Sequence, residues 1–389
     1  MEKYKLSELI VIKNGRDHKD LPNGDYPVFG SGGVMRYVNS YLYDKPSVLL
    51  PRKGSLSNIQ YSDTPFWTVD TLYYTEINEE LVSPYYLYRY LRLLDMSRLD
   101  SGTGVPSMTF DSYYNINVFL PNIEEQRRVA SILQKLDAKI ALNRQINDNL
   151  EAMAKQLYDY WFVQFDFPNE EGKPYKSSGG AMVWNEKLKR EIPQGWYCGT
   201  LLDIAEYTNG LACQKYRPTD NNKLPVIKIK EMHDGLSADT EWVKTDIPDD
   251  VKVFDGDVLF SWSASLEVML WAYGNGGLNQ HIFKVTSKNG YPRSFYFYQL
   301  IHYVGIFKQM AEARKTTMGH ITQDHLKQST IALPPNVDIA NKLEEKLCPI
   351  FDEIVKNNQE IIVLTKLRDE LLPLLMNGQA TINYHLSAC

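Results

Sequence analysis

The chain has 389 residues, of which 43% are hydrophobic, and it carries a formal net charge of −6 at neutral pH. That length and composition suit two or three globular domains. No apolar run approaches the ~20 residues of a membrane span or forms the h-region of a signal peptide, so we expect a cytoplasmic protein. An acidic total argues against unaided binding to nucleic acid, although it still permits a basic face. The four cysteines lack zinc-site or redox spacing and are expected to be free thiols.

Residues 1–121 are predicted to form a first globular unit that mixes short strands and helices. An amphipathic segment at 6–15 closes with the turn signal Asn14-Gly15. A strand-like run ending at Leu50 precedes a polar loop, and residues 85–94 are predicted to be helical.

Residues 122–168 are predicted to form a long helix. Its seam residues are spaced alternately by four and three, which is the a/d pattern of helices that wrap around each other. The aromatic run at 158–167 is expected to pack where the helix meets a globular domain. The seam positions are Val129, Leu133, Leu136, Ile140, Asn143, Asn147, Leu150, Ala154 and Leu157.

The second half of the chain repeats this plan. A connector rich in Gly, Ser, Pro and charge, residues 169–195, leads to a second unit at 196–335. That unit again has an amphipathic segment closed by Asn209-Gly210, a strand-like run before a Ser-rich loop, and a helical stretch at 294–310. We therefore predict an α+β fold with an internal repeat.

A second long helix is predicted at residues 336–378, before a tail at 379–389. The shared heptad register matches Asn143 with Asn357, and a buried Asn fixes register at some cost in stability. Pro349 should kink this helix or delay its regular start. The repeats favour two helices packed together over two helices packed separately on their own domains. The seam positions are Leu343, Leu347, Ile350, Ile354, Asn357, Ile361, Leu364, Arg368, Leu371 and Leu375.

Motifs for catalysis are missing from the sequence. There is no phosphate-binding P-loop, dinucleotide fingerprint, Asn-Pro-Pro-aromatic methyltransferase motif or nucleophile elbow. The run Asp250-Val251-Lys252 resembles half of a nuclease motif, but the neighbouring acids indicate a solvated turn. The histidines of the second unit lack metal-ligand spacing. We therefore predict no catalytic residue and no metal site, which favours a binding protein.

Several motifs together resemble the specificity subunits of type I restriction–modification enzymes. The central region carries W-F-V-Q-F-D-F at 161–167, G-K-P-Y-K-S-S-G-G at 172–180 and I-P-Q-G-W at 192–196. The second unit adds G-D-V-L-F-S at 256–261, L-N-Q-H-I at 278–282 and T-T-M-G-H-I at 316–321, which resemble that family's target-recognition domains. The likeness runs from about Tyr4 to Gly378.

The resemblance implies two target-recognition domains held apart by two antiparallel helices. Each domain would recognise one half of a bipartite, asymmetric site in double-stranded DNA. Two modification subunits would bind the helices and carry the S-adenosylmethionine chemistry, and motor-nuclease subunits would add ATP and magnesium. No cofactor is expected in this chain. A helix of about 35 residues is about 50 Å long, close to one and a half turns of B-DNA at about 34–36 Å per turn.

Polar loops at matched positions are the candidate DNA contacts, because base edges and phosphates are recognised by Arg, Lys, amide and hydroxyl groups. Each unit pairs a loop after a strand with a later loop before the long helix. The first unit offers Arg52, Lys53, Ser55, Ser57, Thr103 and Ser107. The second unit offers Ser261, Trp262, Ser263, Arg314, Lys315, Thr316, Thr317 and His320. We assign partner docking to the seam positions Leu133, Leu136, Ile140, Asn143, Leu150, Leu347, Ile354, Asn357, Ile361 and Leu364.

Alternative functions remain open at this point. The chain could be the recognition subunit of a related restriction system or of a modification-only system. It could also be a coiled-coil scaffold without a DNA role. A fused modification–restriction enzyme would need catalytic motifs that the sequence lacks.

Overall fold

The fold is described from a computed structural model that places residues 1–96, 106–263, 265–313 and 321–379. The chain divides into two compact units, Met1–Ile140 with Leu364–Cys389, and Ala141–Val363. Each long helix therefore contributes one part to each unit. No helix in the described part of the chain combines the length and apolar character of a membrane span.

Unit 1 is built around a four-stranded sheet in the order β2-β8-β5-β6 and a three-stranded sheet in the order β4-β3-β7. Strand β1 pairs with β9, the strand that leads into the long helix α4. The elements are β1 (Glu2–Lys5), α1 (Leu6–Leu9), β2 (Ile10–Asn14), β3 (Tyr26–Gly30), β4 (Gly33–Val38), β5 (Ser47–Pro51), β6 (Gln60–Ser62), β7 (Trp67–Thr68), β8 (Leu72–Ile77), α2 (Pro84–Arg92), α3 (Phe110–Tyr114), β9 (Asn117–Leu120) and α4 (Ile123–Tyr158).

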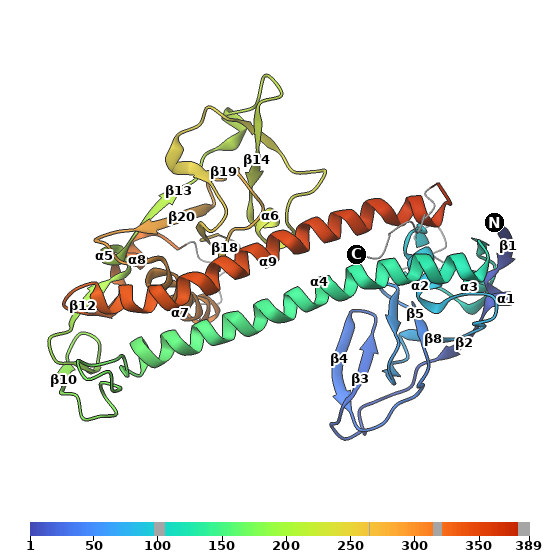
Figure 1. Cartoon of the computed structure of the whole chain (residues 1–389), viewed down its shortest axis with the longest axis horizontal. Coiled ribbons are helices and arrows are strands. Elements are labelled where there is room, and N and C mark those ends of the chain that lie inside the picture. Colours follow the sequence, from blue (N-terminus) through green and yellow to red (C-terminus); the bar gives the residue numbers. More distant parts are fainter. Residues whose placement is uncertain (97–105, 264, 314–320, 380–389) are drawn as a thin grey trace, which may run out of the picture. The chain divides into compact units, whose positions relative to one another are not determined.

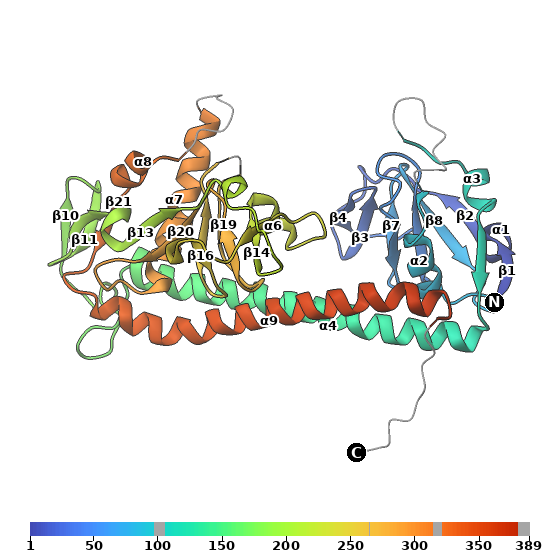
Figure 2. The same ribbon diagram turned by 90° about the horizontal axis from the view of Figure 1, so that it is seen from above.

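Unit 2 repeats this topology with the four-stranded order β13-β20-β17-β18, while β12 pairs with β21 before the second long helix. Its elements after α4 are η2 (Asp159–Val163), β10 (Met182–Asn185), β11 (Arg190–Pro193), β12 (Tyr197–Thr200), α5 (Leu201–Ile204), β13 (Ala205–Asn209), η3 (Cys213–Lys215), β14 (Lys223–Ile227), α6 (Ile229–Asp234), β15 (Trp242–Lys244), η4 (Asp249–Val251), β16 (Lys252–Val253), β17 (Val258–Ser261), β18 (Glu267–Leu270), β19 (Gly276–Leu278), β20 (Ile282–Ser287), α7 (Arg293–Ala313), α8 (Gln323–Gln328), β21 (Thr330–Leu333) and α9 (Asp338–Met376). Helix α7 contacts β18 and β20 of this sheet (Figure 2).

The internal repeat is thus present in the pairing of the strands as well as in the sequence. In both units a parallel pair joins the second sheet, β3 with β7 and β14 with β19. The longer second unit adds α6 and the extra strand β16. The predicted helices at 85–94 and 294–310 correspond to α2 and α7, and the connector at 169–195 contains the hairpin of β10 and β11.

The two long helices pack antiparallel within each unit (Figure 1). In unit 2, Asn143 Nδ2 donates to Glu360 Oε2 at 2.7 Å, and Asn147 Oδ1 accepts from Asn357 Nδ2 at 2.9 Å. In unit 1, Arg368 Nη1 lies 3.0 Å from Asp137 Oδ1. The predicted seam is therefore confirmed, with the buried Asn–Asn contact joining Asn147 and Asn357.

Apolar burial explains the position of each helix half. Val129 and Leu133 join the core of unit 1 with Leu372 and Leu375 from α9. In unit 2, Ala154 of α4 joins Leu343, Leu347 and Ile354 of α9 in the core. The aromatic run that follows α4 enters the same core, as predicted, through Tyr158, Trp161, Phe162, Phe165 and Phe167.

Pro349 does not delay the second long helix, which begins at Asp338 and runs past it. Proline removes one backbone donor and leaves the carbonyl four residues earlier without its helical partner. Both Pro349 and Glu345 are exposed, so water can satisfy that carbonyl.

Candidate nucleic-acid interface

The candidate interface is built at the ends of the central strands β5 and β17. In unit 1, β5 ends at Pro51, and the backbone N–H of Arg52 donates to Thr71 O at 2.9 Å. In unit 2, β17 ends at Ser261, and the N–H of Trp262 donates to His281 O at 3.4 Å. The first residue of each strand-end loop is thus fixed against the segment that leads into the next strand of the sheet.

The residue that follows the later loop of each unit forms one recurring backbone contact with the strand-end loop. In unit 1 the N–H of Met108 donates to Arg52 O at 3.0 Å, and Lys53 forms a β-bridge with Ser107. In unit 2 the N–H of Ile321 donates to Trp262 O at 3.1 Å. The described residues at the end of each later loop therefore lie beside the strand-end loop of the same unit.

An Asn-Gly turn completes the interface at equivalent positions. A Cβ on Gly15 would lie 2.0 Å from Val69 O, and one on Gly210 would lie 2.3 Å from Asn279 O. Only glycine allows the chain to approach another backbone this closely. The turn signals found in the sequence therefore mark the points where the first strand of each sheet reaches the interface.

The structure adds a third segment that the site prediction missed, residues 69–71 in unit 1 and 279–281 in unit 2. Asp70 is exposed and Thr71 is half-buried, while Gln280 and His281 are both exposed. The run T-V-D-T-L at 68–72 precedes β8 as the motif L-N-Q-H-I at 278–282 precedes β20. Both runs lie at the start of equivalent strands in the repeat, and this shared position is the sequence signal that predicts the segment.

The candidate interface of unit 1 offers cations and hydroxyls. Lys53, Ser55 and Ser57 are exposed, and Arg52 is half-buried with Nη1 donating to Asp70 O at 3.3 Å. Asn58 Nδ2 donates to Ser31 O at 2.6 Å, so the loop is also fixed to the hairpin of β3 and β4. These groups can contact phosphates and base edges without a change in the loop backbone.

The unit 2 side is aromatic and polar in its described residues. The Trp262 indole N–H donates to Asn209 Oδ1 at 3.1 Å, and its ring centroid lies 5.7 Å from that of His281. Ser263 is half-buried. Ser261 does not fit the predicted contact role, because it is 0% exposed and its hydroxyl donates to Ser265 O within the same loop.

Six predicted contacts lie outside the described residues. They are Thr103, Arg314, Lys315, Thr316, Thr317 and His320.

The described residues contain no cluster of His, Cys, Asp or Glu that could hold a metal ion. Lys252, from the nuclease-like run, pairs with Asp249 at 2.7 Å, and that carboxylate side chain is 95% exposed. This geometry is that of the solvated turn that the sequence indicated. The three cysteines in the described part of the chain are free thiols.

The fully buried seam positions are not available for partner docking, whereas Leu136, Leu150, Ile361 and Leu364 are half-buried. Leu133, Leu347 and Ile354 are 0%, 0% and 2% exposed, because the two helices cover each other. Exposed apolar residues lie on another face, at Leu142, Ile146 and Met153 of α4, followed by Tyr160 and Val163 of η2. We call these five residues the outer stripe. The sequence analysis missed this face because the seam carries the stronger periodic pattern.

Comparison with known proteins places the fold in a family. A family model described as the type I restriction modification DNA specificity domain matches residues 1–152 and 193–366. The type I restriction enzyme MjaIX specificity subunit of Methanocaldococcus jannaschii is 24% identical over 385 residues, which cover 94% of this chain and 86% of that protein. The type I restriction enzyme HindI specificity subunit of Haemophilus influenzae is 24% identical over 379 residues, covering 78% of this chain and 79% of that protein. A crystal structure of a type I restriction–modification system S subunit from M. genitalium has a TM-score of 0.65 and 15% identity, covering 96% of this chain and 95% of that chain.

Proposed function

Because this chain belongs to the type I restriction–modification DNA specificity family and is a specificity subunit, we propose that each unit recognises its own tract of a bipartite, asymmetric DNA target. The recurring contact between the strand-end loop and the later loop supports this proposal. The hydrogen bonds Met108 N–H to Arg52 O and Ile321 N–H to Trp262 O join equivalent segments in both units. Because the two units share a backbone arrangement but differ in side chains, they would recognise different bases.

We propose that base readout comes from the segments before β8 and β20 as well as from the predicted loops. The Gln280 amide can donate and accept at adenine N7 and N6, whereas the Asp70 carboxylate can only accept, for example from cytosine N4. Lys53 and Arg52 would contact phosphates, which position the duplex without selecting a sequence. Because the chain has a net charge of −6, we propose that partner subunits supply part of the positive charge that contacts the phosphates.

Methylation mapping tests the two-tract target. DNA from cells that express the complete system is sequenced for N6-methyladenine. We expect methylation inside a motif of two fixed tracts separated by a spacer of constant length and undefined sequence. A single continuous motif would contradict the proposal.

We further propose that this chain performs no bond chemistry and that partner subunits bind S-adenosylmethionine, ATP and magnesium. The missing catalytic motifs support this division of labour. Equilibrium dialysis of the isolated chain with labelled S-adenosylmethionine is expected to show no binding. Stoichiometric binding to the purified chain would refute this part of the proposal.

The outer stripe is the surface that we propose for docking of the two modification subunits. Met153 and Val163 are 54% and 43% exposed, and a hollow of about 380 Å³ beside Met153 and Tyr160 can receive an apolar side chain. Exposed apolar patches on a soluble chain are typical of protein interfaces. Leu142→Asp would place a charge on this face without touching the seam, and it should prevent co-purification with the modification subunit. Normal assembly of this variant would refute the assignment.

A further inference from the structure

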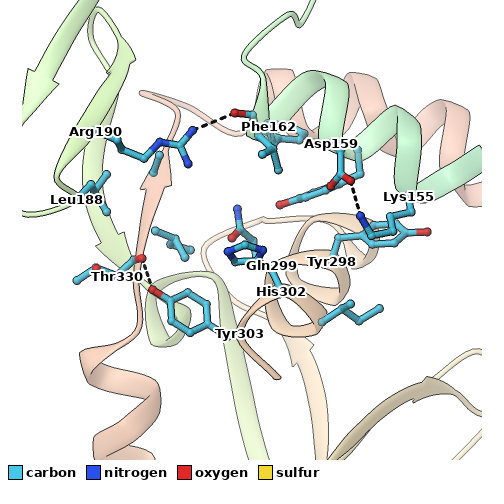
Figure 3. A pocket seen from close by; sticks show the side chains of 15 residues that line it. Lys155, Asp159, Phe162, Leu188, Arg190, Tyr298, Gln299, His302, Tyr303 and Thr330 are labelled. Carbon is cyan, nitrogen blue, oxygen red and sulfur yellow. Dashed lines mark hydrogen bonds and ion pairs between the residues drawn. The ribbon is translucent and has the colours of Figure 1, made fainter. Parts of the chain in front are cut away.

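Unit 2 contains a cavity of about 270 Å³ that the DNA-recognition account does not use (Figure 3). It lies where η2, β11, α7 and β21 meet, and we call it the α7 cavity. Figure 3 shows Arg190 on one side and the side chains of Gln299 and His302, from α7, on another. Phe162, Leu188 and Ile301 give it an apolar lining.

Arg190 brings a positive charge to this cavity. Its guanidinium stacks over the Phe165 ring at 4.5 Å, and Nη2 donates to Val163 O at 3.0 Å. Among the described residues it forms no ion pair with a carboxylate, and Asp159 at the cavity wall is already paired with Lys155. Arg190 as a whole is exposed, and partial desolvation of its guanidinium against this wall lowers its pKa.

Tyr158 adds a hydroxyl with no use inside the protein. The residue is 3% exposed and lines the cavity, yet its hydroxyl has no hydrogen-bond partner among the described residues. Burial raises the pKa of Tyr158 far above its usual range, so the phenol remains protonated and can donate. A buried polar group without a partner is rare in folded proteins and calls for an explanation such as a missing ligand.

The chemistry and size of the cavity point to one kind of occupant. The Arg190 guanidinium offers N–H donors and the Tyr158 phenol offers an O–H donor. Such donors favour a carboxylate, because charge-assisted hydrogen bonds are the strongest available. The volume lies below the range of about 300–1,000 Å³ that holds drug-sized ligands, so it suits a single side chain. Val163 belongs to both the cavity and the outer stripe, so a protein seated on the stripe could reach the cavity.

We propose that the α7 cavity receives an acidic side chain of the modification subunit, which Arg190 and Tyr158 bind through its carboxylate. This inference rests on the proposed docking surface and adds a polar anchor to it. The anchor would fix the register of the subunit along the helix, since the apolar stripe alone tolerates sliding.

Tyr158→Phe is the sharpest test, because it removes only an oxygen atom that has no internal partner. The variant chain should be at least as stable as the wild type, while its affinity for the modification subunit falls about ten-fold or more. Tyr207→Phe is the matched control. Tyr207 is also buried in unit 2 with an unpartnered hydroxyl among the described residues, but it does not line the cavity. Its loss should leave subunit affinity unchanged.

Arg190→Gln provides a second, independent readout. It should weaken subunit binding about ten-fold or more and flatten the dependence of that binding on salt concentration. Affinities are measured by titrating labelled full-length chain with purified modification subunit at several salt concentrations.

The outcomes separate this inference from the docking proposal. If Leu142→Asp abolishes assembly while Tyr158→Phe and Arg190→Gln bind like the wild type, the outer stripe stands and the carboxylate anchor is refuted. If the two cavity variants lose DNA affinity with unchanged subunit binding, the occupant is nucleic acid and the inference is also overturned.

Discussion

One carboxylate, Asp137 of α4, links helix α2 of unit 1 to both long helices. Its oxygens form ion pairs with Arg89 of α2 and with Arg368 of α9, the second at 3.0 Å. The Tyr85 hydroxyl also donates to Asp137 and accepts from Arg89 Nε at 3.0 Å. Since Arg89 is only 5% exposed, its charge has no access to bulk water.

Asp137→Asn should therefore destabilise unit 1 strongly while keeping the shape of the side chain. The change leaves two guanidinium groups facing a neutral amide, and breaking a buried ion pair from one side costs about 3–5 kcal/mol. A difference of 1.4 kcal/mol is a factor of ten in an equilibrium constant. Backbone amides that exchange when unit 1 opens should therefore exchange about 100-fold faster or more.

Hydrogen–deuterium exchange of peptides from α2 and β5 measures this effect, since it reports unit 1 separately in a chain with two units. Glu370→Gln is the control, because its partner Lys366 lies 3.9 Å away and both side chains are exposed. That pair should contribute less than about 1 kcal/mol. If Asp137→Asn exchanges as slowly as Glu370→Gln, the cluster does not hold the unit on the helices.

Three further predictions follow from the same packing. Gly15→Ala should impair recognition of the unit 1 tract, and Gly210→Ala should impair recognition of the unit 2 tract, because each new Cβ collides with backbone at the interface. Binding to duplexes that are varied in one tract at a time shows which recognition is lost. Asn147→Leu should cost about 1–3 kcal/mol by leaving the Asn357 amide unpaired, and chemical denaturation should show recovery when Asn357→Leu is added. Leu136→Asp should separate the helices in unit 1 and destabilise it, so an unchanged denaturation midpoint of this variant would contradict the seam.

The sequence predicted the features that depend on local spacing. The heptad positions and the two Asn-Gly turns follow from patterns within a few residues, and the structure contains both. The aromatic run after α4 was placed correctly for the same reason, since aromatic side chains next to a helix end need a core to enter.

Features created by long-range pairing escaped the sequence analysis. Thr71 reaches Arg52 only because β5 and β8 are neighbours in the sheet, and nothing local marks that contact. Ser261 resembles an exposed loop serine, but its burial depends on how the loop folds back to Ser265. Burial also rules out partner docking for the fully buried seam residues, because a residue that packs inside the chain cannot contact a partner.

The central claim is that two independent readers lie on one chain, and tract-specific binding tests it most directly. The assembled methyltransferase is titrated with duplexes that differ from the target in one tract at a time. Asp70→Ala should relax discrimination only in the unit 1 tract, and Gln280→Ala only in the other, by about 1–3 kcal/mol for each lost base contact. If variants in one unit relax both tracts equally, the chain forms a single composite site and the account is wrong.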